Sequence, residues 1–208
     1  MKCERAVCLI SSGIDSPVAA WLMSKKGVEL IGIHCSNEPL APAGSIEITK
    51  KLCRKVGISK LYVVRHGELV QKRLVKGCKP SLICVLCKRI MLRVAEQIAA
   101  KEGCCCIVTG ENLAQVASQT LDNMVVLSGA VRMPILRPLL CNDKQETVDI
   151  AKEIGTYDIG LDAPKSCTIV PEHPATRASL SAVEAEEQKL GVDSMVEEAV
   201  MSAEVIEI

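Results

Sequence analysis

Short apolar runs alternate along the chain with stretches in which apolar residues recur at helical spacing. The runs at 6–10, 28–34, 61–64 and 104–108 are short and mostly apolar, which is typical of strands buried on both faces. The stretches at 16–26, 44–56, 68–76, 84–101, 112–123 and 143–154 are predicted helices. Because strands that alternate with helices form parallel sheets, we expect an α/β fold, with a parallel sheet and helices on both faces.

Local signals mark the ends of several predicted helices. Gly27 and Gly57 follow the first two helices, where glycine readily adopts the left-handed backbone conformation that ends a helix. Asp143 and Glu146 have the spacing of a capping box at the start of the last predicted helix. These signals support the helix boundaries independently of the apolar pattern.

The composition is that of a folded domain with few aromatic side chains. The chain has 208 residues, of which 49% are hydrophobic and 24% charged, so we expect one domain over 1–208. Within it, 164–208 is predicted to be a C-terminal extension that packs on or near the site. One Trp, two Tyr and no Phe exclude an aromatic platform for stacking several bases. No apolar run approaches the length of a membrane span and no signal peptide is recognisable, so we expect a cytoplasmic protein without a membrane partner.

The two halves of the chain carry opposite charge. Residues 1–101 contain 18 Lys and Arg against 7 Asp and Glu, whereas 102–208 contain 7 against 18. The stretch 50–93 is the most basic, with 13 cations and Glu68 as its one acid. Such an excess favours a surface that binds a polyanion, although solvated helix faces would look the same. The acidic stretch 184–207 is predicted to lie away from that surface or to neutralise it in part.

A small-residue turn follows the first predicted strand and opens the first predicted helix. Its sequence is SSGIDS, from Ser11 to Ser16. Backbone N–H groups at the start of a helix attract an anion, and small side chains allow it to approach. Asp15 would then orient the loop or hold Mg²⁺. Neither a Walker A sequence nor a GxGxxG fingerprint is present, so an ordinary capped turn is the alternative.

This turn and three later blocks resemble one family. SSGIDS resembles the SGGxDS loop of the PP-loop ATP pyrophosphatases, and 11–27 resembles the ThiI-type tRNA 4-thiouridine synthetases. The further blocks are CKRIM at 87–91, TGENLAQVASQTLDNM at 109–124, and 136–139 with 143–144 and 154–156. The resemblance implies the adenine-nucleotide alpha-hydrolase (PP-loop) fold, here without the family's THUMP or rhodanese domains.

The resemblance also implies where ATP would bind. The loop supplies Ser11, Ser12, Gly13, Asp15 and Ser16, with Asp15 as the family's essential aspartate. Its other ATP contacts fall on strand ends and on three later positions: Leu9, Ile10, His34, Cys35, Lys88, Gly110 and Gln119. Ser12 stands where the family usually has glycine. If that position needs a positive φ, the serine costs about 1 kcal/mol.

Three of the twelve cysteines are candidates for sulfur chemistry. Cys84 and Cys87 share one face of a predicted helix, where the helix N-terminus with Lys88 and Arg89 is expected to lower their thiol pKa values. By resemblance, Cys167 is the sulfur-transfer cysteine. Archaeal-type members imply that these three thiols hold a [4Fe-4S] cluster with one open iron. A redox pair or a persulfide relay is the alternative.

The residues outside these motifs receive simpler assignments. His66 and His173 are predicted loop residues, whereas His34 is expected at the nucleotide. Arg132 and Arg137 are predicted to meet phosphate or RNA, or to form ordinary salt bridges.

The resemblance implies an ATP-dependent tRNA sulfurtransferase. A tRNA uridine would be adenylated and then receive sulfur from Cys167 or from the cluster, giving 4-thiouridine. The implied partners are tRNA, a sulfur donor protein or sulfide, a separate RNA-binding protein and a second copy of the chain. Two alternatives stay open: a PP-loop enzyme that thiolates or ligates a small molecule of the thiamine-precursor type, and a non-catalytic sulfur or cluster carrier.

Overall fold

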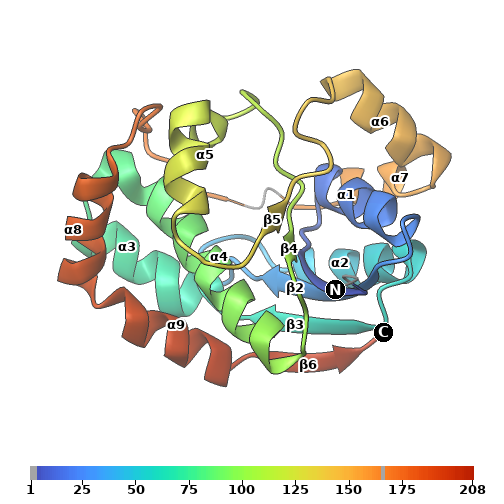
Figure 1. The fold of residues 1–208 in the computed structure, drawn as a ribbon, viewed down its shortest axis with the longest axis horizontal. Coiled ribbons are helices and arrows are strands. Elements are labelled where there is room, and N and C mark those ends of the chain that lie inside the picture. Colours follow the sequence, from blue (N-terminus) through green and yellow to red (C-terminus); the bar gives the residue numbers. More distant parts are fainter. Residues whose placement is uncertain (1–3, 165–166) are drawn as a thin grey trace.

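The computed structural model describes residues 4–164 and 167–208 and contains a six-stranded sheet within them (Figure 1). The strand order is β5-β4-β1-β2-β3-β6. Five strands are parallel: β1 (Arg5–Leu9), β2 (Glu29–Cys35), β3 (Lys60–Val64), β4 (Ile107–Val108) and β5 (Ile135–Leu136). The predicted α/β fold is therefore confirmed, with two differences. The short strand β5 was not among the predicted strands. The sixth strand, β6 (Glu204–Glu207), pairs antiparallel with β3 and was not predicted, because its alternation of polar and apolar residues differs from that of a buried strand.

Helices cover both faces of the sheet, as Figure 1 shows. The strands alternate between two cores: in β1, Val7 joins one core, and Ala6 and Cys8 join the other. The core with Val7 is covered by α3 (Lys72–Gly77), α4 (Ile83–Lys101), α5 (Leu121–Ser128), α8 (Leu180–Leu190) and α9 (Val192–Met201). The opposite core is covered by α1 (Asp15–Ser24), α2 (Ser45–Val56), α6 (Lys144–Glu153) and α7 (Tyr157–Leu161).

Most predicted elements lie within two residues of the observed ones, but the helix predicted at 112–123 is wrong. Ala114 has a φ of +61°, which a helix does not allow, and the Asn112 amide donates to the carbonyl of Asn142 at 2.6 Å. The helix begins only at Leu121, where the Thr120 hydroxyl accepts from the N–H of Asn123. The strand predicted at 104–108 is also shorter, since β4 spans Ile107–Val108.

The capping predictions are confirmed. Asp143 and Glu146 form a capping box at α6, in which each side chain accepts from the backbone N–H of the other residue. Gly57 has a φ of +79° directly after α2, and Gly27 a φ of +80° after α1. In the described residues, no helix is both long and apolar enough to cross a membrane.

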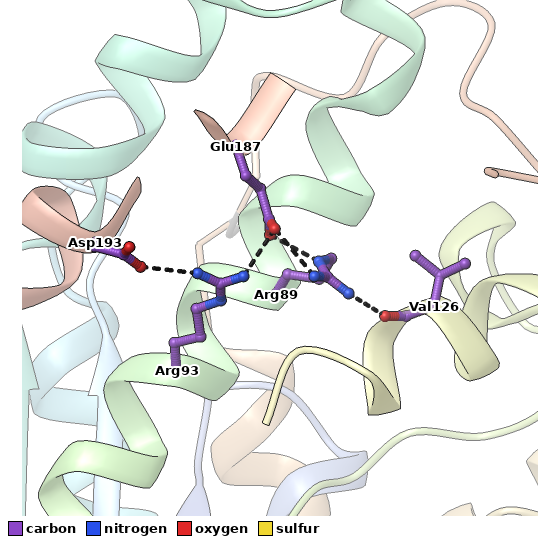
Figure 2. Close-up of polar contacts among 5 residues, drawn as sticks. All are labelled: Arg89, Arg93, Val126, Glu187 and Asp193. Atoms are coloured by element: carbon purple, nitrogen blue, oxygen red, sulfur yellow. Dashed lines mark hydrogen bonds and ion pairs between the residues drawn. The ribbon is translucent and has the colours of Figure 1, made fainter. Parts of the chain in front are cut away.

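A buried ion-pair network joins α4 to the two C-terminal helices, and Figure 2 shows Glu187 between Arg89 and Arg93. Arg89 is 1% exposed, and its guanidinium donates to both carboxylate oxygens of Glu187, at 2.7 and 3.0 Å. Arg89 also donates to the carbonyl of Val126 in α5. Arg93 joins Glu187 at 2.7 Å and Asp193 at 3.0 Å. A charged side chain this deep in the core requires such complete pairing.

The acidic C-terminal stretch neutralises part of the basic one. Glu187, Asp193 and Glu198 pair with Arg89, Arg93 and Arg73, which all lie in 50–93. Other cations of the stretch form no ion pair within the described residues: Lys51, Arg54, Lys55, Lys72, Lys76 and Lys79. Of the two arrangements that the sequence left open, partial neutralisation is the one observed. Positive charge remains on α2, on α3 and just after α3.

Replacing Glu187 is expected to destabilise the fold. In Glu187→Gln the buried guanidinium of Arg89 loses its counter-charge, and we expect the free energy of unfolding to fall by about 3 kcal/mol. Urea denaturation of purified protein measures the change. Glu198→Gln is the matched control, because its pair with Arg73 is 44% exposed on both sides and should change stability by less than about 1 kcal/mol. Equal losses in the two variants would contradict the assigned role of the buried network.

Candidate functional site

The loop at 11–16 is closed by its own serine side chains. The N–H of Ser11 donates to Ser16 Oγ at 2.8 Å, and the two hydroxyl oxygens lie 3.1 Å apart. The N–H of Gly13 donates to Ser11 Oγ at 3.3 Å. These short contacts fold the chain back at the carboxyl end of β1, so that α1 begins at Asp15 with its N-terminus at the same edge of the sheet. The expected anion-binding arrangement of loop and helix start is present.

Gly110 lies against the first turn of α1. A Cβ at this position would come within 2.7 Å of the backbone N of Ser16, which only a glycine avoids. The end of β4 and the start of α1 are therefore in direct backbone contact. Two loops that are far apart in the sequence are brought together at this point.

Two adjoining cavities open at the carboxyl ends of the strands. The larger, about 670 Å³, has a volume within the range of small-molecule sites. The smaller is about 220 Å³, and the two share Ser11, Lys88 and Met91. The larger brings together most of the predicted nucleotide and sulfur residues: Ser11, Ser12, His34, Cys35, Cys84, Cys87, Lys88, Gln119 and Cys167. The smaller contains Leu9, Gly13, Asp15, Ser16 and Gly110.

Two polar atoms in the larger cavity are buried without a protein partner. They are Ser12 Oγ and Gln119 Oε1, and neither has a hydrogen bond within the described part of the chain. Buried polar atoms are normally paired, so orphans that line a cavity indicate a ligand. Backbone strain was expected at Ser12 if this residue has a positive φ. Ser12 does not have one, because Ala114 is the one residue other than glycine with a positive φ in the described part of the chain.

Two ion pairs connect the cavity residues to other elements. Lys144 donates to Asp15 Oδ1 at 2.7 Å, which places the first residue of α6 at the loop. Lys88 donates to Glu111 Oε1 at 3.0 Å. Lys144 and Glu111 were not singled out from the sequence as site residues. The sequence could have identified both residues, because Glu111 lies in the block 109–124 and Lys144 in the block 143–144, which carry the family resemblance.

His34 lies at the cavity, but its ring nitrogens are used inside the protein. Nδ1 lies 3.1 Å from the carbonyl of Ile10, and Nε2 lies 3.1 Å from the hydroxyl of Ser45. Burial lowers the pKa of the His34 imidazole, so the ring stays neutral. It therefore fastens β1 to α2 beneath the cavity. Ile10 lines neither cavity, and its N–H donates to the carbonyl of Ile33.

The thiols of Cys84 and Cys87 have raised pKa values, so the expected lowering is wrong. Burial raises the pKa of Cys84, and it raises that of Cys87 to about 12. The nearby thiol of Cys167 raises both pKa values further, whereas the Gln71 amide lowers that of Cys87 and Lys88 lowers both, without outweighing burial. The expected help from Arg89 is absent because its guanidinium is bound to Glu187 on another side of α4. Both thiols are therefore neutral as placed.

His66 is not the loop residue predicted from the sequence. Its side chain is fully buried, and Nε2 lies 3.1 Å from the sulfur of Cys87. Burial lowers the pKa of His66 to about 4, which keeps the ring neutral. The π-helical turn that follows, Gly67–Gln71, brings the Gln71 amide to 3.8 Å from the same sulfur. No sequence pattern marked this contact.

The strap from Cys167 to Pro174 forms one wall of the larger cavity. Cys167 is exposed, and the Thr168 hydroxyl donates to the carbonyl of Leu40. Ile169, Val170 and Pro174 complete this wall. Further along, α8 and α9 pack on α4, and β6 extends the sheet beyond β3, so 164–208 has one part at the cavity and one part away from it.

The three candidate thiols share the cavity but are not arranged as a metal site. Within 4–164 and 167–208, no set of three His, Cys, Asp or Glu side chains has a geometry that could hold a metal ion. The sulfur of Cys87 is instead in contact with His66 and Gln71. This observation concerns a single metal ion, and the iron–sulfur cluster that the resemblance implies stays a prediction.

Comparison with known proteins gives consistent matches over nearly the whole chain. A protein of Methanosarcina mazei named "Probable tRNA sulfurtransferase" is 40% identical over 98% of this chain and 52% of its own length. A crystal structure of a 4-thiouridine synthetase–RNA complex with bound ATP superposes with a TM-score of 0.93 at 36% identity, covering 99% of this chain and 55% of that one. NMN synthetase from Francisella tularensis shares the fold alone, with a TM-score of 0.59 at 14% identity.

The chain spans about half the length of the relatives that it matches. The family model described as "Thiamine biosynthesis protein (ThiI)" matches residues 2–192, which is most of the chain. Because this model matches far more than half of the chain, the chain belongs to the ThiI family.

Proposed function

We propose that this protein is an ATP-dependent tRNA sulfurtransferase that converts a uridine of tRNA to 4-thiouridine. One observation carries the proposal: a single cavity brings the nucleotide loop, Lys88 and Gln119 together with the thiols of Cys84, Cys87 and Cys167. The names of the matched relatives support the same activity. Such an enzyme works in the cytoplasm, where its RNA substrate is.

ATP is proposed to lie across both cavities with its phosphates at the loop. The unpaired Ser12 hydroxyl and the N-terminus of α1 point to an anion there, and Lys88 adds positive charge. Gln119 Oε1 offers an acceptor for an N–H group of the ligand. Asp15 supplies a carboxylate oxygen of the kind that Mg²⁺ takes, and a Mg²⁺ ion bound with ATP would offset phosphate charge.

The first step is adenylation of the uridine. The O4 oxygen of the base attacks the α-phosphorus of ATP, an O–P bond forms, and pyrophosphate leaves with the electron pair of the broken bond. This exchange converts a poor leaving group on C4 into AMP. The cations and N–H groups at the loop offset the charge that develops on the departing pyrophosphate. Asp15 is tied to Lys144, so the carboxylate keeps a fixed direction beside the loop.

The second step is proposed to transfer sulfur from Cys167. A persulfide on Cys167, loaded by a donor protein or from sulfide and an oxidant, attacks C4 through its outer sulfur and releases AMP. The thiolate of Cys84 then attacks the sulfur of Cys167, which frees 4-thiouridine and leaves a Cys84–Cys167 disulfide for a thiol reductant to cleave. Cys84 suits this role because it is only partly buried and lines the same cavity as Cys167.

An iron–sulfur cluster on Cys84, Cys87 and Cys167 is the other route that the resemblance implies. The persulfide route needs no metal, so the steps above are written through Cys167 and Cys84 alone. Iron and acid-labile sulfide assays on protein purified without oxygen distinguish the two routes. Iron at a fixed ratio to protein, lost in Cys84→Ala, would favour the cluster over the persulfide.

The RNA is proposed to be held by charge. Lys51, Arg54 and Lys55 in α2 and Lys72 and Lys76 in α3 form no ion pair within the described residues, which leaves them available to phosphates. A second copy of the chain, or a separate RNA-binding protein, is proposed to supply further contacts.

The name of the family model favours a thiamine precursor as a second candidate substrate. Pyrophosphate release with thiamine precursors but not with tRNA would select it.

Replacing Asp15 is expected to slow adenylation strongly. Asp15→Asn keeps the shape of the side chain but removes the charge that faces Lys144 and the loop, so pyrophosphate release with ATP and unmodified tRNA should fall by roughly a hundredfold. Asp149→Asn is the control, because Asp149 is exposed on α6 and accepts only from Gln145. Unchanged pyrophosphate release in Asp15→Asn, with folding intact, would exclude the proposed role of the loop.

Replacing Cys167 is expected to separate the two steps. Cys167→Ser should still release pyrophosphate from ATP in the presence of tRNA, because the adenylation site is untouched, but no 4-thiouridine should form. Mass spectrometry of digested tRNA measures the product. Cys141→Ser, which removes another exposed thiol outside the cavities, should retain full thiolation. Normal 4-thiouridine in Cys167→Ser would show that the sulfur takes another path.

A further inference from the structure

Glu111 is a nearly buried carboxylate at the point where three elements of the site meet. It follows Gly110 at the end of β4 and is 8% exposed. Its Oε1 accepts from Lys88 of α4 at 3.0 Å, and its Oε2 accepts from Arg137, just after β5, at 2.9 Å. The Thr109 hydroxyl donates to Oε2 at 3.4 Å. One carboxylate thus joins two cations that are 49 positions apart in the chain.

The charges of this cluster leave a positive excess at the nucleotide loop. Two cations against one carboxylate carry a net charge of +1. Burial favours the neutral acid, but Lys88 and Arg137 outweigh it and lower the pKa of Glu111, so the carboxylate stays ionised. Lys88 has three N–H donors, and the cluster uses one of them. The remaining donors are available to a phosphate.

The three residues have different positions relative to the smaller cavity. Lys88 and Glu111 line it together with Asp15 and Gly110, whereas Arg137 does not. Arg137 lies behind Glu111, where the hydroxyl of Ser128 at the end of α5 accepts from its Nη2 at 3.1 Å. Arg137 therefore fixes Glu111 from outside the cavity, and Glu111 fixes Lys88 at its wall.

The neighbouring residue of α4 supplies a natural comparison. Lys88 and Arg89 are adjacent, yet each is held by a different buried glutamate. Glu187 holds Arg89 and Arg93 beneath α8, and neither Glu187 nor Arg89 lines either of the two cavities. Two carboxylates of similar burial, each with two basic partners, thus differ in whether they face the cavities.

We propose that Glu111, fixed by Arg137, is a positioning residue that holds the Lys88 ammonium against the phosphates of the bound nucleotide. The proposal rests on the proposed use of ATP in these cavities. It assigns Arg137 a role as an anchor of Glu111, in place of direct contact with phosphate or RNA. It also explains why an anionic side chain occupies the wall of a site for an anionic ligand: without the carboxylate, the flexible lysine has no fixed direction.

The test is a double-mutant cycle between Glu111 and Lys88 with Glu187→Gln as the matched control. Four variants are compared with the unmodified protein: Glu111→Gln, Lys88→Met, the double variant and Glu187→Gln. The thermal midpoint of each protein is recorded. Calorimetry measures the affinity for ATP, and pyrophosphate release with unmodified tRNA measures kcat and KM separately. We expect Glu111→Gln to lower kcat by roughly ten- to a hundredfold. The double variant should be no slower than Lys88→Met, because Glu111 acts through Lys88.

The outcomes separate this inference from the proposed function. Glu187→Gln should lower the thermal midpoint but keep the kinetic constants of the unmodified protein. The inference is overturned if Glu111→Gln behaves like Glu187→Gln, or if the losses of Glu111→Gln and Lys88→Met multiply in the double variant. If the unmodified protein releases no pyrophosphate with any tRNA, the proposed function fails. ATP affinity alone then decides the inference, since Glu111→Gln should still weaken ATP binding while Glu187→Gln does not.

Discussion

Parallel hydrogen bonding makes five strands end at one edge of the sheet, and the site depends on that constraint. Residues at or just after the end of each strand lie at this edge: Ser11 after β1, Cys35 at the end of β2, His66 after β3, Glu111 after β4 and Arg137 after β5. No two of these positions are close in the sequence. The ladder of the sheet fixes their spacing, so the loops need little order of their own to form a cavity.

The long helix α4 adds the chemistry that the strand ends lack. Cys87, Lys88 and Met91 lie three, four and seven positions after Cys84, so the four residues form a stripe along the cavity. The same helix buries a second stripe that includes Ile90, in the core between α4 and the sheet. Because the apolar stripe is locked in this core, the rotation of the helix is set, and with it the side from which the thiols meet a ligand. Burial also keeps these thiols neutral, which protects them until a partner removes a proton.

The sequence was sufficient for the repeating parts of the structure and insufficient for contacts between distant segments. Apolar runs located four of the five parallel strands, glycines and a capping box located helix ends, and the loop at 11–16 marked the edge of the sheet where the cavities open. The pattern misplaced a helix at 112–123, because tertiary contacts of Asn112 and the positive φ of Ala114 override a helical periodicity. It also misjudged the thiol pKa values of Cys84 and Cys87, because burial raises them and because Arg89 is paired with Glu187, 98 positions away in the sequence. His66 was missed for the same reason: its contact with Cys87 depends on a π-helical turn that no residue type signals.

The folded chain shows which charges of the two oppositely charged halves pair with each other. A basic first half and an acidic second half could have separated into two faces, with the acids far from any RNA. Instead, acids of the second half reach back to selected cations: Glu187 and Asp193 to α4, Glu198 to α3, and Glu111 to Lys88. The buried pairs fix side chains whose direction matters, whereas Lys51, Lys55, Lys72 and Lys76 form no ion pair within the described residues. In the proposed function, charge is cancelled where geometry is needed and kept where a polyanion would approach, so that one chain with no net charge would hold ATP in its cavity and attract RNA to its surface.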